Sequence, residues 1–203
     1  MAHPKSNAQR SNPEPRTPSP SAGFELLSGA VEETQALGER LGALLKPGDV
    51  VALHGELGSG KTTLIQGIAR GLGRDPSSIR SPTFVIMREY PGATPLVHID
   101  GYRLEGAPAV SWLDLDLIFA PSKITLIEWA QRFSGLLPED HLAVALSHVS
   151  ANRRRLRVSS AGPRAAQIVS QLQAPHSKVS VEDSVTPNSE LQTPNSYHAD
   201  PRD

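Results

Sequence analysis

The sequence predicts an α/β fold, a mostly parallel sheet flanked by helices, and two observations indicate it. Between residues 24 and 162, short apolar runs alternate with amphipathic stretches, which is the pattern of strands joined by helices. Residues 1–23 and 163–203 lack this pattern: each holds five prolines, and Tyr197 alone of the nine aromatic residues lies there. Such segments bury too little apolar surface to offset their ordering entropy. We therefore predict one domain at 24–162 between disordered tails at 1–23 and 163–203.

The elements of this domain follow from the period of the apolar positions. Residues 31–45 place Val, Ala and Leu side chains on one side of a helix, and the Lys-Pro-Gly-Asp sequence after it ends the helix. The apolar run 50–53 is bounded by turn residues, as a buried parallel strand would be. The remaining predictions are helices at 62–71 and 112–119 and strands at 83–90, 96–100, 123–128, 141–149 and 156–159.

Composition excludes several classes of function. The 20 Lys and Arg residues balance 21 Asp and Glu residues, which disfavours a protein that coats RNA. The absence of cysteine excludes disulfides, thiolate zinc sites and cysteine nucleophiles. No apolar run approaches the roughly 20 residues that span a bilayer, and the first residues lack the apolar segment of a secretory signal. We expect a cytoplasmic protein without membrane contact.

The strongest motif is G-x-x-x-x-G-K-[ST], which residues 55–62 match at every fixed position. An apolar strand precedes it and a helix follows, which is the context this phosphate-binding loop (P-loop) requires. Its glycines allow successive N–H groups to face phosphate oxygens, and a helix N-terminus favours anions. Lys61 would neutralise the β- and γ-phosphates during hydrolysis, and the Thr62 hydroxyl would bind Mg²⁺. The sequence thus predicts a P-loop NTPase-like site that uses Glu56, Leu57, Gly58, Ser59, Gly60, Lys61, Thr62 and Thr63.

Such a site needs a further carboxylate at the end of a neighbouring strand. Asp100 and Glu128 each follow an apolar run, and the ends of parallel strands meet at the same edge as the loop. Both are predicted to lie at the site, and the sequence leaves open which of them contacts Mg²⁺. His54, at a strand end, and His98, inside an apolar run, are interpreted as structural. The basic residues within 153–157 fit either contact with phosphate or RNA, or a solvated edge strand.

Four segments together resemble the TsaE family, the small bacterial ATPases of tRNA threonylcarbamoyladenosine biosynthesis. They are HGELGSGKTTLIQGIARGLG at 54–73, SPTF at 81–84, HIDGYRL at 98–104 and LIEW at 126–129. The resemblance covers residues 26–159 and leaves out both tails. P-loops are widespread, but these segments in this order and at similar spacing are specific to the family.

The resemblance implies roles for the matching residues. It implies that the loop binds ATP, that Thr62 is a ligand of Mg²⁺ and that Glu128 helps to hold this ion. Residues 81–83 are implied to form a switch-like loop facing the nucleotide, where the Thr83 hydroxyl could sense the γ-phosphate or position water. Asp100 would orient or activate water, or support the metal. Catalytic roles are therefore expected for Lys61, Asp100 and Thr83.

The resemblance also matches Thr34 to a position near the nucleotide base and Arg154 to an arginine that opens the last strand. The family is implied to dock on a TsaB–TsaD complex, which transfers the threonylcarbamoyl group to adenosine 37 of tRNAs that read codons beginning with A. TsaD and TsaB are then the partners, and tRNA is contacted only through them. The stretch 106–114 departs from the family pattern, because Asp114 stands where Gly is common. We therefore expect the helix in this stretch, and any partner contact it makes, to differ from those of the family.

Two alternatives stay open, a P-loop small-molecule kinase and a nucleotide-dependent adaptor with negligible catalysis. Kinases commonly carry an Arg-rich lid, and the basic residues within 153–157 have no lid-like insertion around them. Hydrolysis by the chain alone is expected to be slow, because Arg103 is the one weak candidate for an arginine finger. We expect a monomer in the absence of partners.

Overall fold

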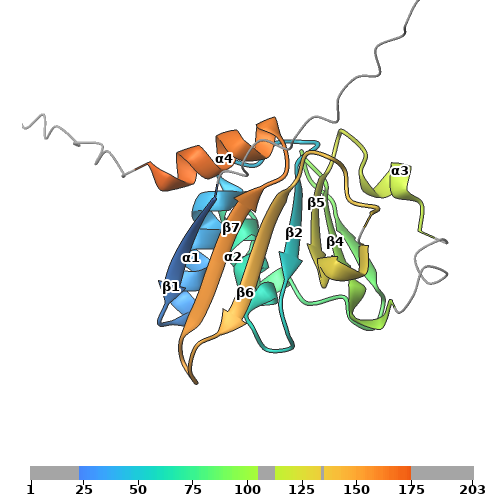
Figure 1. Cartoon of the computed structure of the whole chain (residues 1–203). Helices are drawn as coiled ribbons and strands as arrows, with labels where there is room; N and C mark the ends of the chain where they lie inside the picture. Colours follow the sequence, from blue (N-terminus) through green and yellow to red (C-terminus); the bar gives the residue numbers. More distant parts are fainter. Residues whose placement is uncertain (1–22, 105–112, 134, 175–203) are drawn as a thin grey trace, which may run out of the picture.

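The computed structural model of the chain describes residues 23–104, 113–133 and 135–174. Within them, a seven-stranded sheet has the order β1-β7-β6-β2-β5-β4-β3 (Figure 1). The central strands β6, β2, β5 and β4 run parallel, and β1, β7 and β3 pair antiparallel. The predicted fold class, a mostly parallel sheet flanked by helices, is confirmed. The strands are β1 (Gly23–Ser28), β2 (Val50–His54), β3 (Met87–Tyr90), β4 (Leu96–Asp100), β5 (Ile124–Glu128), β6 (Leu142–His148) and β7 (Arg154–Ser160).

Helices cover both faces of the sheet. On one face, α1 (Val31–Gly42), α2 (Lys61–Gly71) and α4 (Pro163–Gln173) share a core with alternate residues of the strands. The short helices α3 (Leu115–Ile118) and η4 (Ala130–Phe133) close a smaller core over β2, β4 and β5 on the other face. Strand β2 is buried on both sides, as the uninterrupted apolar run predicted. Two further 3₁₀ turns are η1 (Pro76–Ser78) and η2 (Gly101–Arg103).

Glycines set the distance between α1 and α2, which lie side by side behind the sheet (Figure 1). A Cβ atom on Gly38 would lie 2.4 Å from a backbone oxygen of α2, and one on Gly67 would lie 2.2 Å from a backbone oxygen of α1. One turn further along, Gly42 and Gly71 approach the facing helix as closely. Real Cβ atoms do not come this near, so the two helices can pack here only without side chains. This contact fixes α2, whose first turn directly follows the loop after β2.

The domain contains one strand that was not predicted and extends beyond its predicted C-terminal boundary. Strand β1 was not predicted, although it pairs with β7 over its whole length. Helix α4 lies in the segment predicted to be a disordered tail from residue 163, so that boundary was wrong. Two backbone N–H groups at the start of α4 donate to the Asp140 carboxylate, and Ile168, Val169 and Leu172 are buried against the sheet. The predicted tail segments 1–22 and 175–203 lie outside the described residues.

The predicted strand at 83–90 is also too long. Its first half is a turn, in which the Pro82 carbonyl accepts hydrogen bonds from the backbone N–H groups of Val85 and Ile86. Ile86 has a φ of 68°, so the chain bends sharply before β3 begins at Met87. The helix predicted at 112–119 is shorter in the structure, where α3 spans Leu115–Ile118. Residue 112, the first of the predicted range, lies outside the described residues.

Candidate functional site

The Gly-rich loop, defined as residues 55–62, joins β2 to α2 in a conformation that requires glycine. Gly55 has a φ of 146°, and a Cβ atom there would lie 2.4 Å from the Leu146 carbonyl oxygen. Gly60 has a φ of 103° and precedes the first residue of α2. No side chain in the described part of the chain caps this end of α2. The N–H groups of its first turn, together with those of the loop, therefore form a concave surface suited to an anion.

Lys61 is the cation of this loop. Its side chain is 4% exposed, and its Nζ donates to the carbonyl oxygens of Gly55 at 2.8 Å and Glu56 at 2.9 Å. The ammonium also lies 4.5 Å from the centroid of the Trp129 ring. Burial lowers the pKa of Lys61, and the nearby carboxylates of Glu128, Asp100 and Glu56 partly oppose this shift. A charged donor held on two weak acceptors can turn to a stronger acceptor, such as a phosphate oxygen, at little cost.

Thr62 and Glu128 meet at the end of β5. The Thr62 hydroxyl donates to Glu128 Oε1 at 2.8 Å, and His98 Nε2 lies 3.0 Å from the same oxygen. Hydroxyl and carboxylate oxygens are the ligands that Mg²⁺ prefers. Within the described residues, no group of three His, Asp or Glu side chains could hold a metal ion. This set fits an ion that completes its coordination with water and substrate oxygens, as Mg²⁺ does.

Asp100 ends β4 beside Glu128, with which it is paired in the parallel register. Its Oδ2 accepts hydrogen bonds from the hydroxyls of Ser81, at 2.6 Å, and Thr83, and its Oδ1 accepts from the backbone N–H of Tyr102 at 2.9 Å. The Asp100 carboxylate therefore ties residues 81–83 to the end of the sheet. It lies at the site, but its hydrogen bonds come from this loop and from Tyr102, and not from Thr62.

A pocket of about 360 Å³, the sheet-edge pocket, lies where these residues converge. One wall is aromatic: the rings of Tyr102 and Trp129 are 5.1 Å apart and inclined by 54°. Trp129 has a φ of 58°, a strained conformation for a bulky residue, which is typical of functional sites. The pocket is lined by Leu57, Gly58, Gly60, Lys61, Thr62, Thr63, Ser81, Thr83, Asp100, Tyr102, Glu128 and Trp129.

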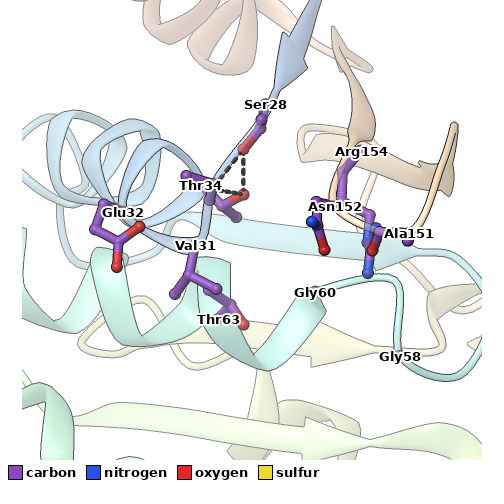
Figure 2. Close-up of a pocket in the computed structure, with 12 residues that line it drawn as sticks. Ser28, Val31, Glu32, Thr34, Gly58, Gly60, Thr63, Ala151, Asn152 and Arg154 are labelled. Atoms are coloured by element: carbon purple, nitrogen blue, oxygen red, sulfur yellow. Dashed lines mark hydrogen bonds between the residues drawn. The ribbon is translucent and has the colours of Figure 1, made fainter.

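A second pocket of about 390 Å³, the hairpin pocket, lies on the other side of the loop, between the start of α1 and the β6–β7 turn (Figure 2). Thr34 is 4% exposed and shares a 2.8 Å hydrogen bond with the Ser28 hydroxyl. Arg154 donates to three carbonyl oxygens of the β6–β7 segment and so holds its shape. Gly58, Gly60 and Thr63 line both pockets, so one elongated ligand could cross the loop and reach into each.

The structure brings most of the predicted site residues to these two pockets. Lys61, Thr62, Thr83, Asp100 and Glu128 line the sheet-edge pocket, and Leu57 and three residues of the loop and first α2 turn join them. Thr34 and Arg154 line the hairpin pocket. Glu56 and Ser59 line neither: Glu56 contributes its carbonyl oxygen to Lys61, and Ser59 is buried.

Several residues were missed by the sequence analysis. Ser28 supports Thr34, and Tyr102 and Trp129 form the aromatic wall. Both aromatic residues lie inside motifs that the analysis quoted, which was the available signal. His98 was interpreted as structural, yet it contacts Glu128. Arg103 donates to the carbonyl oxygens of Thr83 and Phe84, so its guanidinium holds the loop of residues 81–83 in this structure.

Comparisons with known proteins point to a single family. Residues 28–156 match the model of the family described as "Threonylcarbamoyl adenosine biosynthesis protein TsaE". The chain is 37% identical over 142 residues to the TsaE protein of Bacillus subtilis strain 168, covering 70% of this chain and 88% of that protein. It is 42% identical over 136 residues to TsaE of Streptomyces coelicolor, covering 63% of this chain and 90% of the relative.

The fold is also that of a solved relative. The crystal structure of Bacillus subtilis YdiB superposes with a TM-score of 0.64 at 32% identity, covering 76% of this chain and 96% of YdiB. Among the described residues, no helix is long and apolar enough to cross a membrane. The match spans the Gly-rich loop, the start of α1, the ends of β4 and β5 and the β6–β7 turn, and so includes the lining of both pockets. The chain belongs to the TsaE family of threonylcarbamoyl adenosine biosynthesis proteins.

Proposed function

We propose that this chain is a Mg²⁺-dependent ATPase subunit required for threonylcarbamoylation of adenosine 37 in tRNAs that read codons beginning with A. It would act on the TsaB–TsaD complex and reach tRNA only through it. One observation carries the proposal: a Gly-rich loop with a buried lysine lies beside a hydroxyl–carboxylate pair at the edge of a parallel sheet. Family membership supports the pathway, and the site chemistry supports the reaction.

The two pockets suit the two ends of ATP. Backbone N–H groups of the loop and Lys61 would receive the phosphates on the sheet-edge side. The hairpin pocket, with Thr34 and Arg154, would receive the adenosine. Thr62 and Glu128 would hold Mg²⁺, which when bound would offset charge on the β- and γ-phosphates. These oxygen ligands are few, as expected where the nucleotide itself supplies further oxygens.

Hydrolysis would then need a positioned water and a stabilised leaving group. The water oxygen forms a bond to the γ-phosphorus while the bond from that phosphorus to the β–γ bridging oxygen breaks, leaving its electron pair on ADP. Lys61 and the loop N–H groups would stabilise this charge. The Thr83 hydroxyl and the Asp100 carboxylate, already hydrogen-bonded to each other, would orient the water and accept its proton.

The isolated chain is expected to hydrolyse ATP slowly. The described residues that line the sheet-edge pocket include no arginine, and Arg103 is engaged with backbone carbonyls. An added cation at the transferring phosphoryl group can raise the rate by about 10³–10⁵. A partner protein could supply such a group or reorder the loop of residues 81–83, which makes the TsaB–TsaD pair the expected activator.

The test is ATP hydrolysis by the purified full chain with and without the TsaB–TsaD pair from the same source. Strong stimulation, lost on Asp100→Ala, is the expected result. Nucleotide-dependent association with the pair but no hydrolysis would instead establish an adaptor. If the pair causes no stimulation and does not associate with the chain, the small-molecule kinase alternative is reopened. A screen for phosphate acceptors would then follow.

A further inference from the structure

His98 occupies the middle of β4, where its side chain is completely buried. Its Nε2 lies 3.0 Å from Glu128 Oε1 on the neighbouring strand. Its Nδ1 is buried and has no hydrogen-bond partner among the residues that the structure describes. The flanking residues, Val97 and Ile99, are apolar and belong to the buried core.

A purely structural role does not explain this residue. A buried polar atom without a partner costs about 1–3 kcal/mol, and Nδ1 is such an atom. A leucine or methionine would fill a similar volume in this strand without that cost. The contact of the imidazole with Glu128 is its one hydrogen bond among the described residues. What histidine offers here over an apolar side chain is therefore the contact with Glu128.

The geometry of this contact fixes the orientation of the Glu128 side chain. An ionised carboxylate only accepts hydrogen bonds, so His98 Nε2 carries a proton and donates it. Thr62 donates to the same Oε1 from the side of the loop. Glu128 Oε1 is thus held between β4 and α2, and among the described residues no side chain donates to Oε2. No side chain of the described segments then competes with a cation for that oxygen.

We propose that His98 is a positioning residue, which holds the Glu128 carboxylate in the orientation that receives a divalent cation bound with the nucleotide. The inference rests on the proposed function and deepens it. His98 does not itself touch the nucleotide: it acts only through Glu128. Removing groups that hold a metal ligand in place typically weakens metal affinity by about 10- to 100-fold.

The experiment titrates Mg²⁺ against binding of a fluorescent ATP analogue to the full-length chain, beginning in EDTA. His98→Met should need about 10- to 100-fold more Mg²⁺ to reach half-maximal enhancement of binding. Its nucleotide affinity in EDTA should match that of the unaltered chain, because no phosphate or base contact is lost. In a Glu128→Gln background, His98→Met should cause no further change, because the two residues act as one unit.

Two amides provide a matched pair of controls. The amide nitrogen of His98→Gln lies near the place of Nε2 and can still donate to Glu128, so Mg²⁺ dependence should return to within about 3-fold of the unaltered chain. The amide nitrogen of His98→Asn lies near the place of Nδ1 and should behave like His98→Met. This pair compares one chemistry at two positions, and thermal unfolding without ligand shows that each variant is folded.

Three results would overturn the inference. The Mg²⁺ requirement could be the same in His98→Met and the unaltered chain, or nucleotide affinity in EDTA could fall as much as affinity in Mg²⁺, which marks a structural role. Failure of His98→Gln to restore the Mg²⁺ dependence while it folds normally would also exclude positioning. If the unaltered chain binds no nucleotide, or binds it without regard to Mg²⁺, the proposed function itself fails.

Discussion

The two pockets on either side of the Gly-rich loop differ in the charge and polarity of the residues that line them. The sheet-edge pocket is lined by three charged side chains that are almost fully buried, Lys61, Asp100 and Glu128, each at 4% exposure or less. The hairpin pocket is lined mostly by small neutral residues, with Glu32 and Arg154 as its charged members, and its buried polar contact joins two hydroxyls, Ser28 and Thr34. The loop and the first turn of α2 are common to both.

This difference predicts how strongly substitutions in each pocket affect nucleotide binding and hydrolysis. Buried charges interact strongly because little water screens them, so their removal is costly and depends on the charge of the ligand. Neutral hydroxyls contribute about 1 kcal/mol each and discriminate by shape and hydrogen bonding. We therefore expect substitutions in the sheet-edge pocket to have large effects that depend on phosphate and Mg²⁺. Those in the hairpin pocket should have small effects that are independent of Mg²⁺.

Lys61→Ala should have the largest effect. It removes the buried cation that faces the phosphates, and loss of one partner of a buried charge pair costs about 2–5 kcal/mol. We expect the affinity for Mg²⁺·ATP, measured by calorimetric titration, to fall by about 100-fold or more. Arg70→Ala, at the other end of α2 in an exposed ion pair with Glu39, is the control and should bind normally. Unchanged affinity in Lys61→Ala would contradict the assignment of this loop.

Asp100→Ala should separate catalysis from binding. The carboxylate orients the Thr83 hydroxyl, and a positioned proton acceptor contributes about 10²–10⁴ to a rate. We expect hydrolysis in the presence of the partners to fall by about 100-fold, while nucleotide affinity changes by less than about 5-fold. Glu89→Ala removes an exposed carboxylate that pairs with Lys123 outside both pockets and is the control. Equal loss of affinity and rate would point to a structural role for Asp100.

Thr34→Val should have a smaller effect that involves both stability and affinity. The substitution keeps the shape of the side chain but leaves the Ser28 hydroxyl without one partner, which costs about 1 kcal/mol of unfolding free energy. Nucleotide affinity should fall only about 2- to 5-fold, and equally with and without Mg²⁺. Urea unfolding and nucleotide titration measure the two effects. A drop in nucleotide affinity that occurs only in the presence of Mg²⁺ would show that the hairpin pocket does not act independently of the sheet-edge pocket.

Ser59→Ala should be the mildest change and is expected to stabilise. The Ser59 hydroxyl is fully buried and has no hydrogen-bond partner among the described residues, so its removal eliminates an unpaired polar group. The unfolding free energy should be unchanged or rise by about 1 kcal/mol, with nucleotide affinity retained. Ser28→Ala, whose hydroxyl donates to the Ala30 carbonyl, should destabilise by a similar amount. A loss of stability in Ser59→Ala would mean that this hydroxyl has a partner in solution.

The sequence was most informative where a structure depends on near neighbours. The Gly-rich loop, its flanking strand and its helix were predicted from one continuous stretch, and the structure has all three. Two buried strands that end in an acid, at Asp100 and Glu128, were also predicted, because an apolar run followed by an acidic residue can be seen in the sequence alone. Helix α4 was missed although its apolar spacing was visible, because the prolines and polar residues after it dominated the composition of the segment.

What the sequence alone determined is therefore the local chemistry: a phosphate-type loop, a lysine and a threonine at fixed positions within it, and two acids at strand ends. Only the tertiary structure decided how these acids are used. Register pairs Asp100 with Glu128, yet one holds the loop of residues 81–83 and the other is held by His98 and Thr62. The physical reason is the separation along the sequence of the residues that interact. Backbone conformation in a turn depends on the few residues within it, whereas these hydrogen bonds join residues 17 to 66 positions apart, which only the folded sheet brings together.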